Sequence, residues 1–467
     1  MWYGVEYHLN MLISLSNWIT SGYILTESVR RNLKDLVRVV SLGRLPVLLQ
    51  GETSVGKTSL ISYLAQLTGN KCVRVNNHEH TDLQEYVGSY TADTSGKLLF
   101  REGVLVNAMR KGHWLILDEL NLAPSEVLEA LNRLLDDNRE LFITETQETV
   151  RAHPRFLLFA TQNPPGGNYG GRKQLSRAFR NRFVELHFDE IPPNELEIIL
   201  QRRCHMPPSY CKRCVAVMCE LQLRRRGSAA FAGKQGFMTL RDLFRWAERY
   251  RQAPSPPAGQ FYDWDQHLGD EGYLILAGRV RKEEEVDVIR EVLEKQFKVR
   301  IHPDRLFTLN EATSPVTRYI LEAVSRMESH DQFEHIVWTY SLRRLAVLVG
   351  KALHFVEPVL LVGDTGCGKT SVCQYLSTQN GCQLMTINCH QYSEGSDFLG
   401  GLRPVRSHSD TNDSNDGDDV KNADKDRLFE WIDGPLVQSM IGGHFFLAGE
   451  LPLLRSFCDF TASQANS

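Results

Sequence analysis

The stretch GETSVGKTSL, Gly51–Leu60, decides the fold of this chain, and a near copy, GDTGCGKTSV, lies at Gly363–Val372. Both match the pattern G-x-x-x-x-G-K-[ST], in which backbone N–H groups and the lysine surround phosphate and the hydroxyl binds Mg²⁺. The apolar run LPVLLQ precedes the first loop, and TSLISYLAQL, a pattern typical of a helix, follows it. A strand, a phosphate loop and a helix in this order predict an α/β P-loop fold that binds ATP.

The residues of both loops are expected to contact ATP. Lys57 should reach the outer phosphate oxygens and Thr58 should bind Mg²⁺, and Lys369 and Thr370 hold the same places in the second loop. The expected contacts are Gly51, Glu52, Thr53, Ser54, Val55, Gly56, Lys57, Thr58 and Ser59, and then Gly363, Asp364, Thr365, Gly366, Cys367, Gly368, Lys369, Thr370 and Ser371. Whether both sites work depends on the residues that follow each loop.

Two further apolar runs end in polar side chains that suit phosphate chemistry. HWLILDEL, His113–Leu120, contains Asp118 and Glu119, and FLLFATQNP, Phe156–Pro164, contains Asn163. We expect Asp118 to hold Mg²⁺, usually through water, Glu119 to polarise the attacking water, and Asn163 to touch that water or the γ-phosphate. The carboxyl ends of parallel strands share one edge of a sheet, where ligands bind. These side chains are therefore expected to meet beside the first loop.

Length, charge and cysteine content set broad limits. The 467 residues suggest about three domains. The ten cysteines are scattered, which favours a reducing compartment over a disulfide framework. The N-terminal MLISLSNWIT is too short to span a bilayer, and Glu6 without a basic segment argues against a signal peptide. The sequence predicts a cytosolic or nuclear protein with no membrane partner.

Several long segments carry a resemblance to a known family. They are LLQGETSVGKTSLISYLA, HEHTDLQEYVGSY, the stretch from LILDELNLAPSEV to FLLFATQNPP, and LSRAFRNRFVELHFDEIP. These segments closely resemble the tandem AAA+ modules of the midasin family, giant dynein-related ATPases that remodel precursors of the large ribosomal subunit. The resemblance runs almost continuously from about Ser21 to Glu450. It implies an AAA+ core, a parallel sheet flanked by helices, followed by a helical lid.

The resemblance also implies roles for single residues. ATQNP resembles sensor 1, centred on Asn163, and FMTLRDLFRWAERY resembles the sensor 2 helix of the lid, with Arg241 facing the γ-phosphate. AFRNRF resembles the arginine finger, which reaches the nucleotide of a neighbouring module; Arg182 is favoured and Arg180 is the alternative. Each arginine could instead be a solvated helix charge. RELFITETQETVRAHPRF alternates apolar and polar residues, which predicts an exposed hairpin.

The implied function is ATP hydrolysis, using ATP and Mg²⁺, that drives release of assembly factors from pre-60S ribosomal particles. The implied location is the nucleus, in the nucleolus and nucleoplasm, and the implied partners include neighbouring AAA+ modules of the same ring. Two alternatives stay open: a nucleotide-gated scaffold without hydrolysis, and a nucleic-acid motor. The Asp118–Glu119 pair argues against the scaffold for the first module. A net charge of −4 and the lack of a basic, aromatic-rich stripe make direct nucleic-acid binding unlikely.

The predicted domains follow from the motifs. Residues 1–20 are a remnant or an N-terminal extension, 21–192 the first AAA+ core, 193–334 a helical lid and connector, and 335–467 a truncated second AAA+ core. The second core contains an acidic insert, 407–426, predicted to be a disordered loop, with an acidic interaction segment as the alternative. CKRC in the lid has the spacing of a zinc half-site, but no second pair lies at the expected distance, so Cys204, Cys211, Cys214 and Cys219 are interpreted as helix residues.

The second module departs from the first where the chemistry is decided. DGPLVQSMIGGHFFLAGEL aligns with EGVLVNAMRKGHWLILDEL, so Gly449 stands in the place of Asp118 and Glu450 in that of Glu119. We expect the second module to be incomplete, poorly folded and catalytically silent. The chain itself is expected to be a fragment, a splice product or a mis-assembled gene model of a larger protein.

Overall fold

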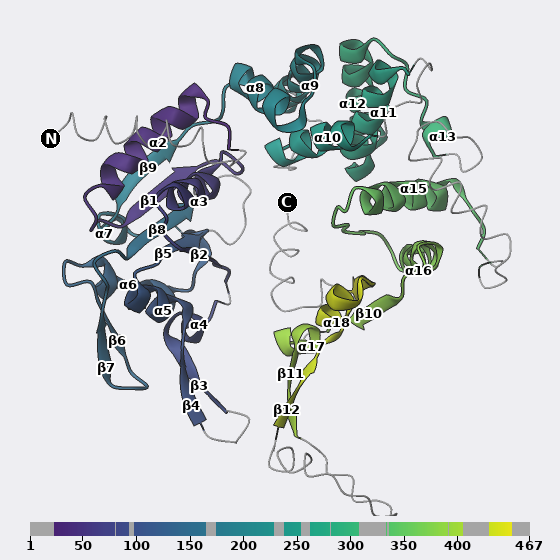
Figure 1. Cartoon of the computed structure of the whole chain (residues 1–467). Helices are drawn as coiled ribbons and strands as arrows, with labels where there is room; N and C mark the ends of the chain where they lie inside the picture. The colour runs from purple at the N-terminus through teal and green to yellow at the C-terminus, as the bar shows by residue number, and fades with distance from the viewer. Residues whose placement is uncertain are drawn as a thin grey trace, which may run out of the picture.

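The computed structural model describes residues 23–79, 81–92, 98–164, 174–227, 238–253, 262–280, 282–307, 333, 336–390, 392–404 and 429–450. The predictions made for residues 1–20 and for the acidic insert 407–426 lie outside the described residues. Figure 1 shows the first core, a group of lid helices and the second core following one another along the chain. None of the described helices is both long and apolar enough to cross a membrane.

The first core is built on a parallel sheet of five strands in the order β2-β5-β8-β1-β9. The strands are β1 (Val47–Gly51), β2 (Cys72–Asn76), β5 (Trp114–Asp118), β8 (Leu157–Gln162) and β9 (Val184–Phe188). All residues of β5 and β8 are buried. Parallel strands covered on both faces read as continuous apolar runs, which is why the three apolar runs predicted β1, β5 and β8 correctly.

Helices cover both faces of this sheet. One face packs against α2 (Glu27–Val40) and α3 (Lys57–Leu67) in a core that includes Leu49, Trp114 and Phe159. The other face packs against α4 (Leu83–Val87), α5 (Val104–Lys111) and α6 (Ser125–Leu135), with η1 (Leu120–Leu122) and α7 (Arg177–Arg180) alongside. Neighbouring residues of one strand, such as Leu48 and Leu49, therefore pack into different hydrophobic clusters on opposite faces of the sheet. The predicted α/β architecture is confirmed.

Two antiparallel hairpins project from the first core, and in Figure 1 they lie at the end opposite the lid. They are β3 (Gly88–Ala92) with β4 (Leu98–Glu102), and β6 (Glu140–Ile143) with β7 (Glu148–Arg151). The second confirms the hairpin predicted before the third apolar strand. Its alternation has a physical basis, because Leu141 and Ile143 are buried while Phe142 is 38% exposed.

The lid is helical. It comprises α8 (Pro193–Cys204), α9 (Pro208–Gly227), α10 (Leu240–Gln252), α11 (Trp264–Leu276), η2 (Ala277–Arg279), α12 (Glu283–Phe297) and α13 (Pro303–Leu306). Cys204, Cys211 and Cys214 belong to its hydrophobic core, and burial raises the pKa of Cys211 to about 11. These thiols thus pack as small apolar groups. Within the described ranges no three His, Cys, Asp or Glu side chains form a group that could hold a metal ion.

A carboxylate of the lid fastens it to the first core. Glu195, near the start of α8, accepts hydrogen bonds from the backbone N of Ser28 at 2.9 Å and from Ser28 Oγ at 2.5 Å. Ser28 lies in the first turn of α2, where N–H groups lack helical partners. Burial alone would raise the pKa of Glu195, but the bonds from Ser28 oppose this and the net pKa is lowered. The carboxylate form is therefore the one that joins lid and core.

The second core repeats part of the first. Its elements are α15 (Tyr340–His354), α16 (Lys369–Gln379), β10 (Leu384–Asn388), α17 (Gly395–Leu399), β11 (Gly400–Pro404), β12 (Phe429–Asp433), α18 (Pro435–Gly442) and β13 (Phe445–Gly449). β10 pairs with β13 in parallel, Asn388 opposite Gly449, just as Asn76 of β2 lies opposite Asp118 of β5. In each core these paired residues lie at the carboxyl ends of the two strands.

The strand before the second phosphate loop does not form among the described residues. Its counterpart β1 is buried between β8 and β9. In the second core Leu360 and Val362 are 65% and 69% exposed, and no described strand pairs with them. An apolar run becomes a buried strand only when neighbouring strands accept its backbone hydrogen bonds.

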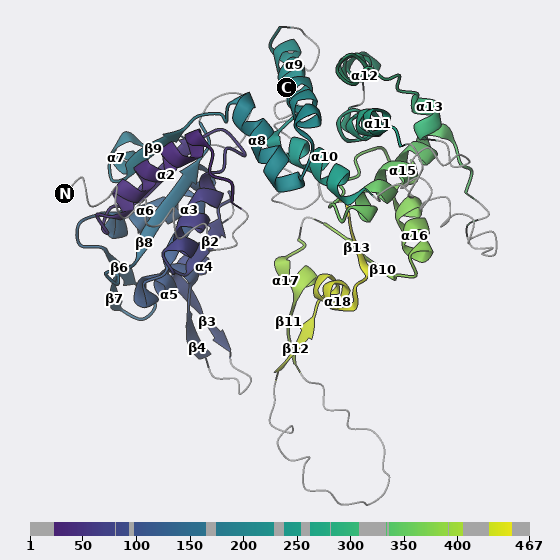
Figure 2. The ribbon, with the colours of Figure 1, turned by 45° about the horizontal axis from the view of Figure 1, so that its top comes forward.

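A buried charge network joins the lid to the second core. Lys351 of α15 forms an ion pair with Glu271 of α11, and both side chains are 2% exposed. Arg249 of α10 binds Glu271 at 3.1 Å and Glu357 at 2.8 Å. Burial alone would raise the pKa of Glu271, but Lys351 and Arg249 lower it to about 2. Removing one partner of a buried ion pair is strongly destabilising, so this network holds α15 against the lid. Figure 2 shows α15 beside the lid helices.

Candidate nucleotide-binding and hydrolysis site

The first phosphate loop has the backbone that anion binding requires. Ser54 and Gly56 have φ angles of 68° and 90°, and Gly56 precedes the first residue of α3 without supplying a side-chain cap. The N–H groups of the first helical turn can therefore bond to a phosphate. Gly51 has a different reason to be glycine, because a Cβ there would lie 2.4 Å from the carbonyl oxygen of Phe188 on β9.

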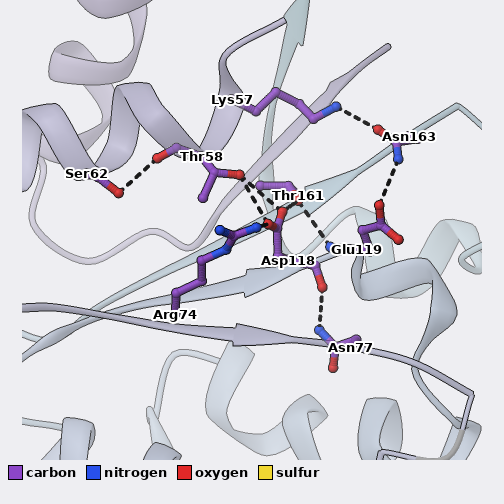
Figure 3. A network of polar contacts seen from close by, with 9 residues as sticks. All are labelled: Lys57, Thr58, Ser62, Arg74, Asn77, Asp118, Glu119, Thr161 and Asn163. Carbon is purple, nitrogen blue, oxygen red and sulfur yellow. Dashed lines mark hydrogen bonds and ion pairs between the residues drawn. The ribbon is translucent and has the colours of Figure 1, made fainter. Parts of the chain in front are cut away.

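Lys57 lies at the centre of the site and is only 8% exposed. Its Nζ donates to the carbonyl oxygens of Gly51 at 2.5 Å and Glu52 at 2.9 Å, and to Asn163 Oδ1 at 2.8 Å. The ammonium group is thus held by its own loop and by Asn163, which directly follows β8 (Figure 3). A buried cation among carbonyl oxygens is suited to receive the oxygens of a polyphosphate.

The two predicted metal ligands face each other. Thr58 Oγ1 lies 3.2 Å from Asp118 Oδ1 and 3.3 Å from Oδ2. Asp118 also accepts a hydrogen bond from Thr161 Oγ1 and forms an ion pair with Arg74. Hydroxyl and carboxylate oxygens are the ligands that Mg²⁺ takes in phosphate-binding sites. The residues present therefore fit a Mg²⁺ ion held by Thr58 and Asp118.

Glu119 is turned away from Asp118 by its backbone. Its φ of 52° lies in the left-handed region, a conformation that costs about 1–3 kcal/mol for a residue other than glycine. Its N–H donates to Thr161 Oγ1 at 3.1 Å, and its Oε1 accepts from Asn163 Nδ2 at 3.4 Å. Asn163 therefore bridges Lys57 and Glu119 (Figure 3). The structure brings the predicted lysine, carboxylates and amide together at one sheet edge.

Three residues of this site were missed by sequence reasoning. Thr161 bonds Asp118 and the backbone of Glu119, and its place at the end of an apolar strand could have marked it. Asn77 donates from its backbone N and its Nδ2 to the carbonyl oxygen of Asp118, at 3.0 and 2.9 Å. Arg74 is a lone charge within a short strand, and nothing in the pattern distinguishes it from a solvated residue.

The predicted arginines have partners in their own module or lie at the surface. Arg180 binds Glu185 with two hydrogen bonds, of 2.7 and 2.6 Å. Arg182 donates to Asn132 and pairs with Asp136 at 3.0 Å. Arg241 is exposed at the start of α10. Their assignment as finger or sensor residues stays a prediction.

The second phosphate loop copies the backbone of the first. Gly366 and Gly368 have φ angles of 80° and 82°, and Lys369 Nζ donates to the carbonyl oxygens of Gly363 and Asp364, both at 2.7 Å. Thr370 is exposed. Most of the predicted contacts of this loop are exposed, namely Gly363, Asp364, Thr365, Gly366, Cys367 and Thr370, whereas Gly368, Lys369 and Ser371 are half-buried.

The second loop lacks the carboxylate of the first. Gly449 occupies the strand position that corresponds to Asp118, and a Cβ there would lie 2.8 Å from Asn388 Oδ1. Its carbonyl oxygen still accepts from the backbone N of Cys389 at 2.9 Å, as that of Asp118 does from Asn77. The backbone of the metal site is therefore kept while its charged ligand is absent.

Comparisons with known proteins agree with this geometry. The family model of the AAA domain of the dynein-related subfamily matches residues 46–183 and 358–456, together about half of the chain, and the midasin AAA lid domain matches residues 195–300. The chain is 48% identical to a midasin of Dictyostelium discoideum and 37% identical to one of Giardia intestinalis, each over 93% of its length. An uncharacterized protein of Staphylococcus aureus is 32% identical over 34% of the chain and 60% of that protein.

The chain spans only 8% and 9% of the two midasins. The two family models nevertheless match both phosphate loops and the lid between them. From its parallel sheet, its two glycine-bounded loops and these similarities, the chain belongs to the dynein-related subfamily of AAA proteins and carries a lid of the midasin type.

Proposed function

We propose that the first module hydrolyses ATP and works within a midasin-like machine that releases assembly factors from pre-60S ribosomal particles. The observation that carries the catalytic part is the meeting of Lys57, Asp118, Glu119 and Asn163 at one sheet edge. The sequence identity to two midasins supports the place of this module in a midasin-like machine. The proposal includes a location in the nucleolus and nucleoplasm and neighbouring AAA+ modules as partners.

The proposed mechanism uses each group for positioning or charge. Lys57 would exchange its carbonyl partners for phosphate oxygens, and Thr58 and Asp118 would hold the metal. Mg²⁺ when bound offsets the negative charge of the phosphates. Glu119 orients the attacking water and accepts its proton, while Asn163 positions Glu119 relative to the phosphate. Phosphoryl transfer needs little else from a protein, because its catalysis is mostly positioning and charge neutralisation.

The test compares two activators of ATP hydrolysis. This chain, joined to the remaining modules of a midasin, is assayed with pre-60S particles and with the same mass of protein-free ribosomal RNA. We expect the particles to raise the rate and the RNA to leave it unchanged, since the chain has a net charge of −4. Equal stimulation by RNA would favour the nucleic-acid motor instead.

For the second module we propose nucleotide binding without hydrolysis. Lys369 can cradle phosphate, but Gly449 offers no carboxylate for the metal. Replacing Lys369 by Ala should therefore leave the ATPase rate of the chain unchanged and should remove one nucleotide from the bound total measured by equilibrium dialysis. Lys57→Ala is the matched variant in the first loop and should abolish turnover. A clear loss of turnover in Lys369→Ala would mean that the second loop works as a catalytic site.

A further inference from the structure

Arg74 is a charged neighbour of Asp118 that the proposed mechanism does not use. It lies on β2, the edge strand next to β5, and its Nη2 forms an ion pair with Asp118 Oδ2. The Arg74 side chain is 54% exposed, whereas that of Asp118 is 10% exposed. Figure 3 shows the guanidinium at the carboxylate beside Thr58. The carboxylate is thus nearly buried, whereas the guanidinium has access to water.

The ion pair and a metal ion need the same carboxylate. Asp118 Oδ1 already accepts from Thr161, and Oδ2 receives Arg74. A divalent cation bound by Thr58 and Asp118 would lie close to the guanidinium, and like charges repel strongly where water is scarce. Because the arginine is half-exposed, it can move into solvent without leaving a buried gap. The arrangement favours exchange of one cation for the other.

We propose that Arg74 is a counter-ion of Asp118 that holds the carboxylate in place without metal and leaves it when a divalent cation binds. Arg74 thereby sets the Mg²⁺ concentration at which the site fills. The residue positions a ligand of the metal and is not itself catalytic. This inference rests on the proposed ATPase site.

The second core supplies an internal comparison. Its strand β10 pairs with β13 in the same register as β2 with β5, but Thr386 stands where Arg74 does, and Gly449 where Asp118 does. The arginine is therefore not needed to form this strand pair. It is absent from the module that also lacks the carboxylate, as expected of a residue whose role depends on that carboxylate.

The test measures metal binding directly. Mn²⁺ replaces Mg²⁺, and free Mn²⁺ is followed by electron paramagnetic resonance in the full chain with a non-hydrolysable ATP analogue. Lys369→Ala is present throughout, so that only the first site contributes. Arg74→Ala should lower the Mn²⁺ concentration at half-saturation by roughly two- to fivefold, the range expected for loss of a half-exposed ion pair. Arg74→Thr, which introduces the residue of the second module, should lower the midpoint as Arg74→Ala does. Arg74→Lys should leave the midpoint near that of the unsubstituted protein.

The control is Arg38→Ala on α2, since Arg38 is 53% exposed and pairs with Asp35 far from the metal ligands in sequence. It should leave the midpoint unchanged. An unchanged or raised midpoint in both Arg74→Ala and Arg74→Thr, with an unaltered thermal unfolding curve, would overturn the inference and leave the ATPase proposal intact. Absence of Mn²⁺-dependent nucleotide binding in the chain without the Arg74 change would overturn both.

Discussion

Replacing Glu119 by Gln is expected to lower ATP turnover by about 10²–10⁴-fold, the usual contribution of a general base, with little change in nucleotide affinity. The amide keeps the size of the side chain but cannot accept the proton of the attacking water. Glu119 contacts Asn163, and Asn163 contacts Lys57. The substitution therefore acts where the attacking water would lie and leaves the phosphate loop unchanged. Binding and hydrolysis therefore separate.

The measurement pairs steady-state hydrolysis with titration of a fluorescent nucleotide, in this chain joined to its neighbouring modules. Lys57→Ala should instead weaken nucleotide binding itself, because it removes the buried ammonium group. Glu126→Gln is the matched control, since Glu126 is exposed in the first turn of α6. Equal hydrolysis by the Glu119→Gln and unsubstituted proteins would defeat the assignment of Glu119.

The second large effect concerns the arginine finger. The isolated chain should hydrolyse ATP about 10³–10⁵-fold more slowly per site than the same chain joined to its neighbouring modules, the range that such an arginine contributes. Arg180 and Arg182 are each paired within their own module. We therefore expect hydrolysis of the nucleotide at Lys57 to depend on an arginine supplied by an adjacent module.

The two candidate fingers can be separated by single substitutions in the joined protein. Arg182→Ala should remove the acceleration of the neighbouring site, while Arg180→Ala should have a smaller effect, because its two hydrogen bonds to Glu185 hold it against β9. Single-turnover hydrolysis at each site, with the other silenced by replacing the lysine of its phosphate loop with Ala, gives the rates. An isolated chain as fast per site as the joined protein would rule out a finger supplied in trans.

The candidate catalytic groups of the first module could be predicted from the sequence because each follows a strong local pattern. Lys57 and Thr58 lie in a glycine-bounded loop, and Asp118 and Asn163 lie at the ends of continuous apolar runs. The carboxyl ends of parallel strands meet at one edge, so identifying the strands was enough to bring these side chains together. The hairpin at Glu140–Arg151 was predicted in the same way, from its period of two.

The supporting groups could not be read in this way. Arg74, Asn77 and Thr161 carry no pattern of their own, and their roles arise from the pairing of β2, β5 and β8. The left-handed backbone of Glu119 is likewise a consequence of the turn that leaves β5. The buried contact of Lys351 with Glu271 joins residues far apart in sequence, and neither has a local signature.

The sequence by itself determined the two phosphate loops and which side chains are candidates for catalysis, since short-range pattern and backbone chemistry specify these. The tertiary structure decided which apolar runs became strands: β1 is buried between two neighbours, while the equivalent run before Gly363 stays exposed with no described strand beside it. It also decided which charges meet, as with Arg74 and Asp118. Strand pairing and ion pairing both need a second segment of chain, and its place is set by packing and not by local sequence.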